Sequence, residues 1–252
     1  MDSKEKEVIY SFLSTAERWA RGYGEVGPMP VFSDDPEPAS APPESPAAGA
    51  GGHTSFGTID ELVSCVRECR RCPLAETRTN TVPGIGSIRP LVMVIGEGPG
   101  ADEDAQGEPF VGKAGQLLDK MLSAIRLSRR TNCYIANIIK CRPPNNRDPS
   151  PEESAACAPF IQEQIRLLSP KLILTVGRIA VQNLLSTSQG ITRIHGQFFT
   201  YKGALEKGIP LMPTYHPSAL LRNEELKRPA WEDLKLFKNR LLELAPDYDR
   251  GG

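Results

Sequence analysis

The sequence predicts an α/β fold: three α/β/α layers with a central four-stranded parallel sheet. Short apolar runs alternate with stretches of helical periodicity from residue 59 onward. Strands that are apolar on both faces and separated by helices are typical of a parallel sheet covered on both sides. The expected strands are 91–95, 133–139, 172–176 and 210–215, and the expected helices are 59–70, 114–126, 151–168, 178–186 and 229–244.

Four segments follow one another along the chain. Residues 1–23 carry an apolar stripe at helical spacing, which predicts a short amphipathic helix. Seven prolines lie within residues 28–46, so we expect residues 24–57 to form a disordered Pro/Ala-rich linker. A globular domain is then expected over residues 58–245, followed by a flexible tail at 246–252.

Charge and hydropathy limit which partners and which cellular location we expect for this protein. Residues 1–57 hold nine acids and four bases, and since the whole chain carries −1, the remainder carries +4. A mildly basic body is compatible with a nucleic-acid partner. The apolar run at 91–95 is too short to span a bilayer, and the charged N-terminus is unlike a signal peptide. We therefore expect a cytoplasmic monomer with no membrane partner.

Unusual peptides are expected to meet at one edge of the sheet. Gly-Glu-Gly-Pro-Gly at 96–100 follows the first strand, Asn137 lies in the second, and Tyr-His-Pro-Ser at 215–218 follows the last. Parallel sheets bind ligands outside the carboxyl ends of their strands. A buried amide needs hydrogen-bond partners, and His216 is better placed than a typical core histidine. Taken singly, a turn role for Asn137 and a core role for Phe110 stay open.

Six cysteines without a secretory signal are expected to be reduced thiols, which favours metal or cluster binding over disulfides. Cys69 and Cys72 form a tight pair, and Cys141 and Cys157 follow far along the chain. Four thiolates without histidine suit zinc or a 4Fe–4S cluster, and the spacing does not separate the two. An alternative includes Cys65, because Cys65-x-x-x-Cys69-x-x-Cys72 has the spacing of radical S-adenosylmethionine enzymes.

Together these peptides resemble the family 4 uracil-DNA glycosylases, the iron–sulfur branch of the uracil glycosylase superfamily. The likeness covers about residues 60–245. It rests on Cys-Arg-Arg-Cys-Pro-Leu at 69–74, Gly-Glu-Gly-Pro-Gly at 96–100, Gly-Glu-Pro-Phe-Val-Gly-Lys-Ala-Gly at 107–115, Asn-Ile-Ile-Lys-Cys-Arg-Pro-Pro-Asn-Asn-Arg-Asp-Pro at 137–149, Cys157, and Tyr-His-Pro-Ser at 215–218. Their joint order and spacing are highly specific.

The resemblance implies a hydrolase that removes flipped-out uracil from DNA and so initiates base excision repair. It makes Phe110 the ring that stacks on uracil, Asn137 the reader of the uracil edge, and His216 the group that faces O2. Glu97 and Gly98 would line the reaction centre. Better-known uracil glycosylases position the attacking water with an aspartate, and this chain has Gly98 there. Either Glu97 helps instead, or the reaction relies mostly on stabilising the leaving group.

The resemblance also assigns the metal site and leaves two thiols as bystanders, Cys65 and Cys133. A structural 4Fe–4S cluster would be held by Cys69, Cys72, Cys141 and Cys157. Two rival classes stay open: a radical S-adenosylmethionine enzyme, and a non-catalytic iron–sulfur accessory protein that binds DNA within a polymerase complex.

DNA contacts are expected from residues 217–222, a segment that would wedge into the minor groove and bring Leu220 to the vacated stack. Phosphate contacts would come from basic side chains, namely Arg222, Arg142, Lys140 and Arg147. No lysine stands beside the pocket motifs in an obvious nucleophilic role, so we predict a monofunctional glycosylase without lyase activity. The N-terminal helix is expected either to dock on a replication or repair protein or to pack on its own body.

Overall fold

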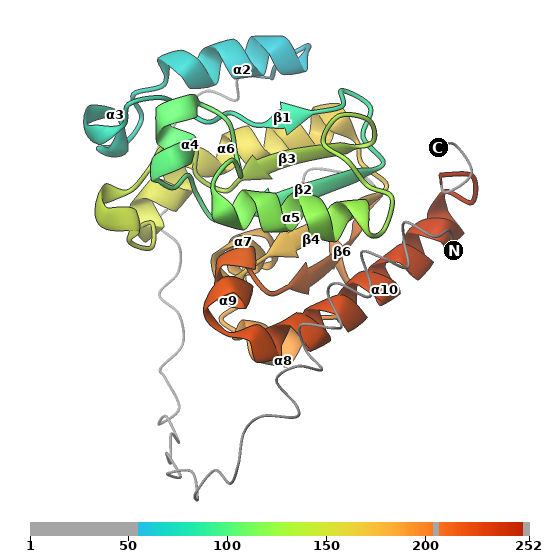
Figure 1. Ribbon diagram of the computed structural model, residues 1–252. Helices are drawn as coiled ribbons and strands as arrows, with labels where there is room; N and C mark the ends of the chain where they lie inside the picture. The colour runs from blue at the N-terminus through green and yellow to red at the C-terminus, as the bar shows by residue number, and fades with distance from the viewer. Residues whose placement is uncertain (1–54, 204–206, 249–252) are drawn as a thin grey trace, which may run out of the picture. The chain divides into compact units, whose positions relative to one another are not determined.

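The computed structural model describes residues 55–203 and 207–248 (Figure 1). The expected N-terminal helix and nearly all of the expected linker lie outside these residues, as does most of the expected tail, so those expectations stay predictions. Among the described residues, no helix has the length and apolar character needed to cross a membrane.

Four parallel strands form the centre of the sheet, as the sequence predicted. In spatial order they are β3 (Cys133–Asn137), β2 (Val92–Gly96), β4 (Leu172–Val176) and β6 (Ile209–Thr214). Every residue of the first three strands is buried, because helices cover both faces. Gly96 is paired with Asn137 at the ends of β2 and β3, so this register brings two of the conspicuous motifs together.

The sheet has six strands rather than four, which corrects the expected strand count. The short strand β1 (Ile85–Gly86) runs antiparallel to β3, and β5 (Phe199–Tyr201) runs antiparallel to β6. Both lie at the edges and have only two or three residues. Such short pieces carry no readable alternation of apolar and polar residues, so sequence periodicity does not reveal them.

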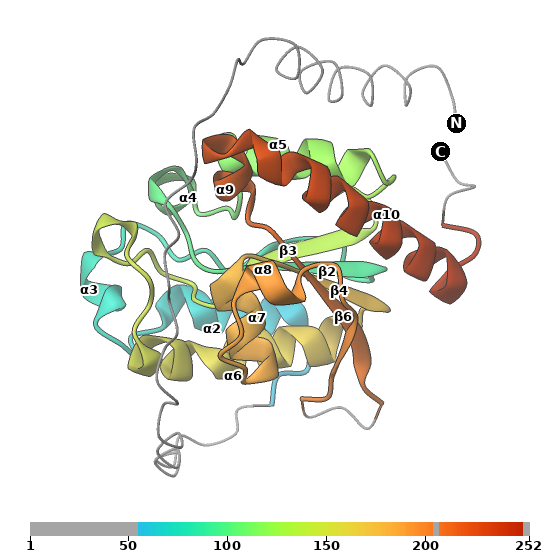
Figure 2. The same ribbon diagram turned by 90° about the horizontal axis from the view of Figure 1, so that it is seen from below.

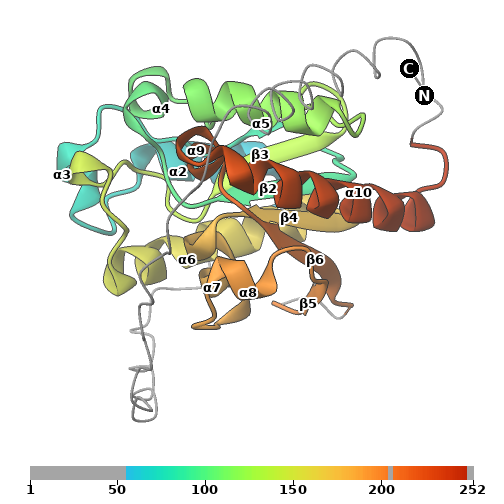
Figure 3. The same cartoon turned by 60° about the horizontal axis from the view of Figure 1, so that its bottom comes forward.

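Helices cover both faces of the sheet, which confirms the three-layer architecture (Figures 2 and 3). Helices α5 (Lys113–Ser123) and α10 (Lys227–Leu244) pack on one face against Val92 and Val94. Helices α2 (Ile59–Glu68), α6 (Pro151–Leu168) and α7 (Arg178–Leu185) cover the other face, where Met93 and Ile95 point. The alternation of side chains along β2 thus fills two separate cores.

Local signals explain where the long helices begin. The side chain of Thr58 caps α2 and that of Ser150 caps α6, each in a capping box with a glutamate three residues later. Pro151 occupies the first turn of α6, where its missing N–H costs nothing. Both helices begin at the residues expected from the sequence, 59 and 151.

Several short helices were not expected from the sequence. They are α3 (Leu74–Thr77), α4 (Ala101–Gln106), α8 (Ile191–Ile194) and α9 (Pro217–Arg222), with 3₁₀ turns at Pro144–Asn146 and Glu224–Leu226. Helix α4 begins directly after the glycine-rich loop, in a stretch where we expected no helix between residues 70 and 114. Its sequence, Ala-Asp-Glu-Asp-Ala-Gln, has no apolar stripe, which is why periodicity missed it.

Candidate active site at the carboxyl edge of the sheet

The carboxyl ends of the parallel strands open into one hollow of about 520 Å³. In Figure 1 the arrowheads of β2 and β3 lie on the same side of the molecule as α4 and α9. The hollow brings together five residues expected from the sequence, Glu97, Gly98, Phe110, Asn137 and His216. The expected convergence of separate motifs on this edge is therefore present.

Asn137 and Phe110 meet directly beside Gly96. A Cβ placed on Gly96 would lie 2.5 Å from Asn137 Oδ1 and 2.6 Å from Phe110 Cζ, so no larger residue fits there. Asn137 is 1% exposed, and its Oδ1 is buried without a hydrogen-bond partner in the described residues. An orphaned buried acceptor costs about 1–3 kcal/mol, which makes it a natural place for a ligand donor.

Phe110 is held in an unusual backbone conformation. Its φ is +56°, a left-handed value that non-glycine residues adopt at a cost of about 1–3 kcal/mol. Arg129 supports it, donating from Nη1 to the carbonyl of Pro109 at 2.7 Å and from Nη2 to the carbonyl of Phe110 at 2.8 Å. Gly115 allows the close approach, since a Cβ there would lie 1.9 Å from the carbonyl oxygen of Phe110.

His216 is the N-cap of α9 and faces the ring of Phe110, with 5.7 Å between the ring centroids. Its Nδ1 accepts from the Ser218 amide at 3.2 Å and lies 2.8 Å from the Ser218 hydroxyl. Burial lowers the pKa of His216 to about 4, the charge of Arg222 adds to this, and Glu103 opposes it. The imidazole is therefore neutral at pH 7, and because Nδ1 is an acceptor, the proton is on Nε2.

Glu97 follows β2 and lines the same hollow. Burial raises the pKa of its carboxyl, and nearby Asp148 raises it further, while the Arg178 guanidinium works in the opposite direction. Asp148 and Arg178 are themselves paired, with 2.5 Å between Oδ2 and Nη2. A carboxyl group with a raised pKa beside a cavity is a candidate for proton transfer or for orienting water.

Glu103 joins the two loops that frame the hollow. Its Oε2 accepts from the amide of Gly100, and its Oε1 accepts from the amides of Val111 and Gly112 at 2.9 and 3.1 Å. The carboxylate thereby ties the glycine-rich loop to the segment that carries Phe110. Glu103 also lines the hollow, and these bonds were not predicted from the sequence.

Four cations surround the hollow: Lys113, Arg147, Arg178 and Arg222. Lys113 is the lysine among them, and the prediction of a monofunctional enzyme requires that it does not act as a nucleophile. The expectation that Lys140 contacts a phosphate is wrong, because its side chain is 1% exposed and cannot reach a phosphate in this conformation. Arg142 is half-buried and donates from Nε to Asn146 Oδ1 at 2.8 Å.

The apolar side chain that α9 offers to the outside is not the expected one. Leu220 is 1% exposed and packs in the core, whereas Leu221 is 47% exposed. The sequence had suggested a loop here, in which either leucine could point outward. Because residues 217–222 instead form a helix, its rotation fixes which leucine is inside.

The four cysteines expected to bind metal line one small cavity, together with Arg71, Arg78 and Lys140. Arg78 Nη1 lies 3.1 Å from Cys141 Sγ. Burial raises the pKa of Cys157 to about 12, and it also raises that of Cys141 against the influence of Arg78. A bound metal ion deprotonates the thiols that coordinate it, and the three basic neighbours suit a group with net negative charge.

The remaining two cysteines do not line this cavity. Cys133 is buried in β3, where burial raises its pKa to about 12, so it behaves as a structural thiol. Cys65 lies in α2 and packs against the core. In the part of the chain that the structure describes, no group of three or more Cys, His, Asp or Glu side chains is arranged around a single-ion site.

Comparison with known proteins agrees with this geometry. A model of the family described as "Uracil DNA glycosylase superfamily" matches residues 83–235. The chain belongs to this superfamily. The matched residues contain every residue that lines the hollow, from Glu97 to Arg222.

Relatives named type-4 uracil-DNA glycosylase resemble most of the chain. The protein from Thermotoga maritima is 42% identical over 189 residues, which cover 72% of this chain and 96% of the relative. The protein from Sulfurisphaera tokodaii is 40% identical over 204 residues, covering 77% of this chain and 91% of the relative. The protein from Archaeoglobus fulgidus is also 40% identical, covering 71% and 90% respectively.

Three supporting residues were missed by sequence reasoning: Gly96, Arg129 and Gly115. Gly96 stood in the quoted loop, yet its role comes from the strand register, which a sequence does not display. Arg129 lies nineteen residues from Phe110 and no motif connects the two. Of these three residues, only Gly115 could have been recognised from the sequence, because a glycine inside an expected helix suggests close packing.

Proposed function

We propose that this protein is a uracil-DNA glycosylase, a hydrolase that cleaves the N-glycosidic bond of uracil in DNA and so initiates base excision repair. The observation that carries the proposal is the buried, unpartnered Oδ1 of Asn137 beside the ring of Phe110 and the imidazole of His216. Family membership and the type-4 relatives support the same reaction.

Recognition of the base follows from the amide of Asn137. A base inside a duplex is out of reach, so it must be extruded into the pocket. Uracil presents a donor at N3 and an acceptor at O4, which match the carbonyl oxygen and the NH₂ of the asparagine. Cytosine presents the opposite pattern and would leave Oδ1 unpaired. The ring of Phe110 supplies a surface on which the extruded base stacks.

Stabilisation of the leaving group is assigned to His216. Breaking the glycosidic bond leaves negative charge on the uracil ring, and a neutral Nε2–H in a dry pocket can donate to O2. Preorganised donors of this kind typically contribute about 3–4 kcal/mol to the transition state. The Ser218 amide keeps Nδ1 as the acceptor, so the donor is fixed before uracil enters.

Water attack on the sugar is assigned to Glu97. Gly98 occupies the position at which the aspartate is expected, and a Cβ there would lie 2.7 Å from Ile139 Cγ1. Glu97 is the neighbouring carboxyl group of the hollow. In its ionised form it can orient water and attract the cationic sugar that the departing base leaves behind.

DNA binding is proposed along the cationic rim. Arg222, Arg178, Arg147 and Lys113 line the pocket and would contact phosphates. Arg142 would join them, since it donates to Asn146, which also lines the pocket. Leu221, rather than Leu220, would enter the space that the extruded nucleotide leaves. We propose monofunctional chemistry, in which Lys113 forms no covalent bond with DNA. Borohydride should therefore trap no covalent complex between protein and DNA.

A 4Fe–4S cluster held by Cys69, Cys72, Cys141 and Cys157 is proposed as a structural cofactor. The shared cavity and its basic neighbours support this assignment. When bound, the cluster would cross-link the segment before β1 to the start of α6. Purified protein should contain about four irons per chain and absorb visible light; a colourless protein with zinc would refute the cluster.

The function is tested with an oligonucleotide that contains one uracil. Incubation followed by hot alkali should cut the strand at the uracil, whereas matched strands with thymine or cytosine should stay intact. The Asn137→Ala variant is the matched inactive control. Binding of the uracil strand without release of uracil would favour the accessory-protein class, and dependence on S-adenosylmethionine would favour the radical class.

A further inference from the structure

Lys140 is a fully buried cation that the proposed reaction does not use. It follows the end of β3 and is among the largest completely buried side chains of the protein. Its Nζ donates to the carbonyl oxygen of Asn137 at 2.7 Å and to Gln164 Oε1 at 2.6 Å. One ammonium group thus holds the strand end that carries the uracil-reading amide.

The second acceptor connects Lys140 to the cysteine-bearing helix. Gln164 lies in α6, the helix that also contains Cys157. Its Nε2 donates to the carbonyl of Pro83 at 2.8 Å and to the Tyr134 hydroxyl at 3.4 Å, so the amide orientation is fixed. The network therefore spans the region from the segment before β1, through β3, to α6.

The charge of Lys140 needs compensation that these two bonds do not supply. Both acceptors of Nζ are uncharged, and a buried ammonium without a counter-charge costs several kcal/mol. Negative charge is available in the same cavity, because Lys140, Cys141 and Cys157 all line it.

We propose that Lys140 is a positioning residue that couples the cysteine site to the uracil pocket. Its ammonium compensates the charge of the thiolate-bound cluster and, through the carbonyl of Asn137, holds the end of β3 in place for base recognition. This inference rests on the proposed function and on the proposed cluster. Loss of the ammonium should therefore disturb both sites, although Lys140 contacts no substrate.

The first test removes the charge while it preserves the packing. In Lys140→Met we expect fewer irons per chain, a more negative reduction potential of the cluster, and a kcat on the uracil oligonucleotide that falls by about tenfold with KM changed less than threefold. The exposed Lys120 of α5 supplies the matched control, since Lys120→Met should change none of these values.

A double variant separates positioning from packing. Lys140→Met with Gln164→Leu also removes the side-chain oxygen that the single variant leaves without its donor, and it fills the site with apolar atoms, so the unfolding temperature should recover toward that of the wild type. The potential and kcat should stay low. If both return to wild-type values together with the unfolding temperature, Lys140 only fills space and the inference is overturned.

A near-isosteric variant covers the case in which the methionine variants do not fold. Gln164→Glu gives Lys140 a carboxylate partner and draws its charge away from the thiolates, while the bond to Asn137 remains. We expect a more negative potential with a smaller loss of kcat. An unchanged potential would overturn the inference, as would wild-type protein without an iron cluster. Failure of the proposed function would appear separately, as absent uracil release by a wild-type protein that holds its cluster.

Discussion

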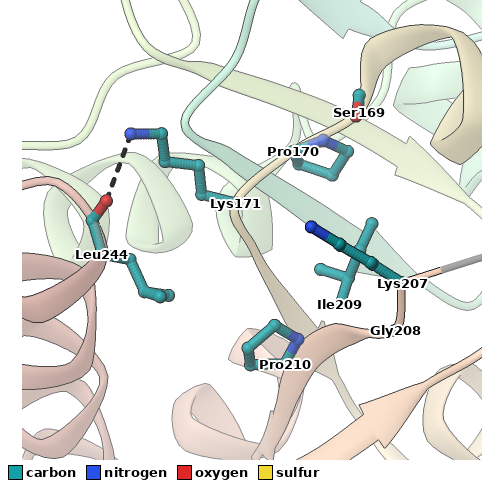
Figure 4. Close-up of a pocket in the computed structure, with 8 residues that line it drawn as sticks. All are labelled: Ser169, Pro170, Lys171, Lys207, Gly208, Ile209, Pro210 and Leu244. Carbon is teal, nitrogen blue, oxygen red and sulfur yellow. Dashed lines mark hydrogen bonds between the residues drawn. The ribbon is translucent and has the colours of Figure 1, made fainter.

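The two ends of the central sheet carry hollows of similar size but different chemistry. The hollow at the carboxyl edge is about 520 Å³, and the one at the amino edge is about 550 Å³ (Figure 4). Of the two lysines at the amino edge, Lys171 donates from Nζ to the carbonyl of Leu244 at 3.1 Å, and Lys207 is exposed to solvent. At the carboxyl edge Asn137 keeps an unpaired acceptor beside a neutral His216. Size alone does not distinguish the two; unsatisfied, preorganised polar groups do.

The largest loss of activity at the carboxyl edge is expected from a substitution of Asn137. Replacing Asn137 with Ala should reduce single-turnover release of uracil by about 10³-fold, because the amide provides both the acceptor and the donor that define the base. The measurement is strand cleavage after alkali under enzyme excess. A loss smaller than tenfold would mean that the unpaired acceptor has no part in recognition.

His216 should produce the next largest effect. Replacing it with Leu removes the Nε2 donor and should slow release by about 10²–10³-fold, while Gln should recover part of the rate. Since burial holds the pKa of His216 near 4, the imidazole stays neutral from pH 8 to about pH 5. The rate attributable to this residue should therefore be flat over that range, as a pH series with the Gln variant as reference will measure.

The pH dependence of the rate of uracil release should instead come from Glu97. Its carboxylate is the active form and burial raises its pKa, so the rate should fall as the pH drops through a value above the ordinary 4.5. The Glu97→Gln variant should be about 10²-fold slower and should lose this acidic limb. An acidic limb that persists in the variant would assign it to another group.

Arg222 should affect affinity rather than chemistry. Its replacement with Ala should weaken binding of uracil-containing DNA a few-fold and reduce the salt dependence of binding by about one unit of slope. Titrations at several salt concentrations measure both quantities. An unchanged slope would place the phosphate contacts elsewhere on the rim.

The smallest effect is expected from a substitution at the amino edge of the sheet. Lys171→Met removes a favourable cation at the end of α10, so the free energy of unfolding should fall by less than about 1 kcal/mol. Uracil release should be unchanged. A large loss of activity would show that the hollow in Figure 4 is coupled to the reaction.

The sequence predicted the central architecture and most of the site for clear physical reasons. Long apolar strands and capped helices have strong periodic signals, and motifs at strand ends must converge because parallel strands end at one edge. What failed depended on tertiary placement. The burial of Lys140 and the inward turn of Leu220 are each decided by packing that local pattern does not encode. The clamp of Arg129 on Phe110 joins residues with no shared motif.

The left-handed backbone of Phe110 has a consequence for how the molecule meets DNA. Arg129 and Gly115 fix that conformation in the free protein, so the aromatic platform exists before any nucleotide arrives. Most of the conformational adjustment during base capture must then occur in the DNA, because the receiving surface is already rigid. The pocket therefore discriminates between bases as each base enters, because its shape does not adjust to the base.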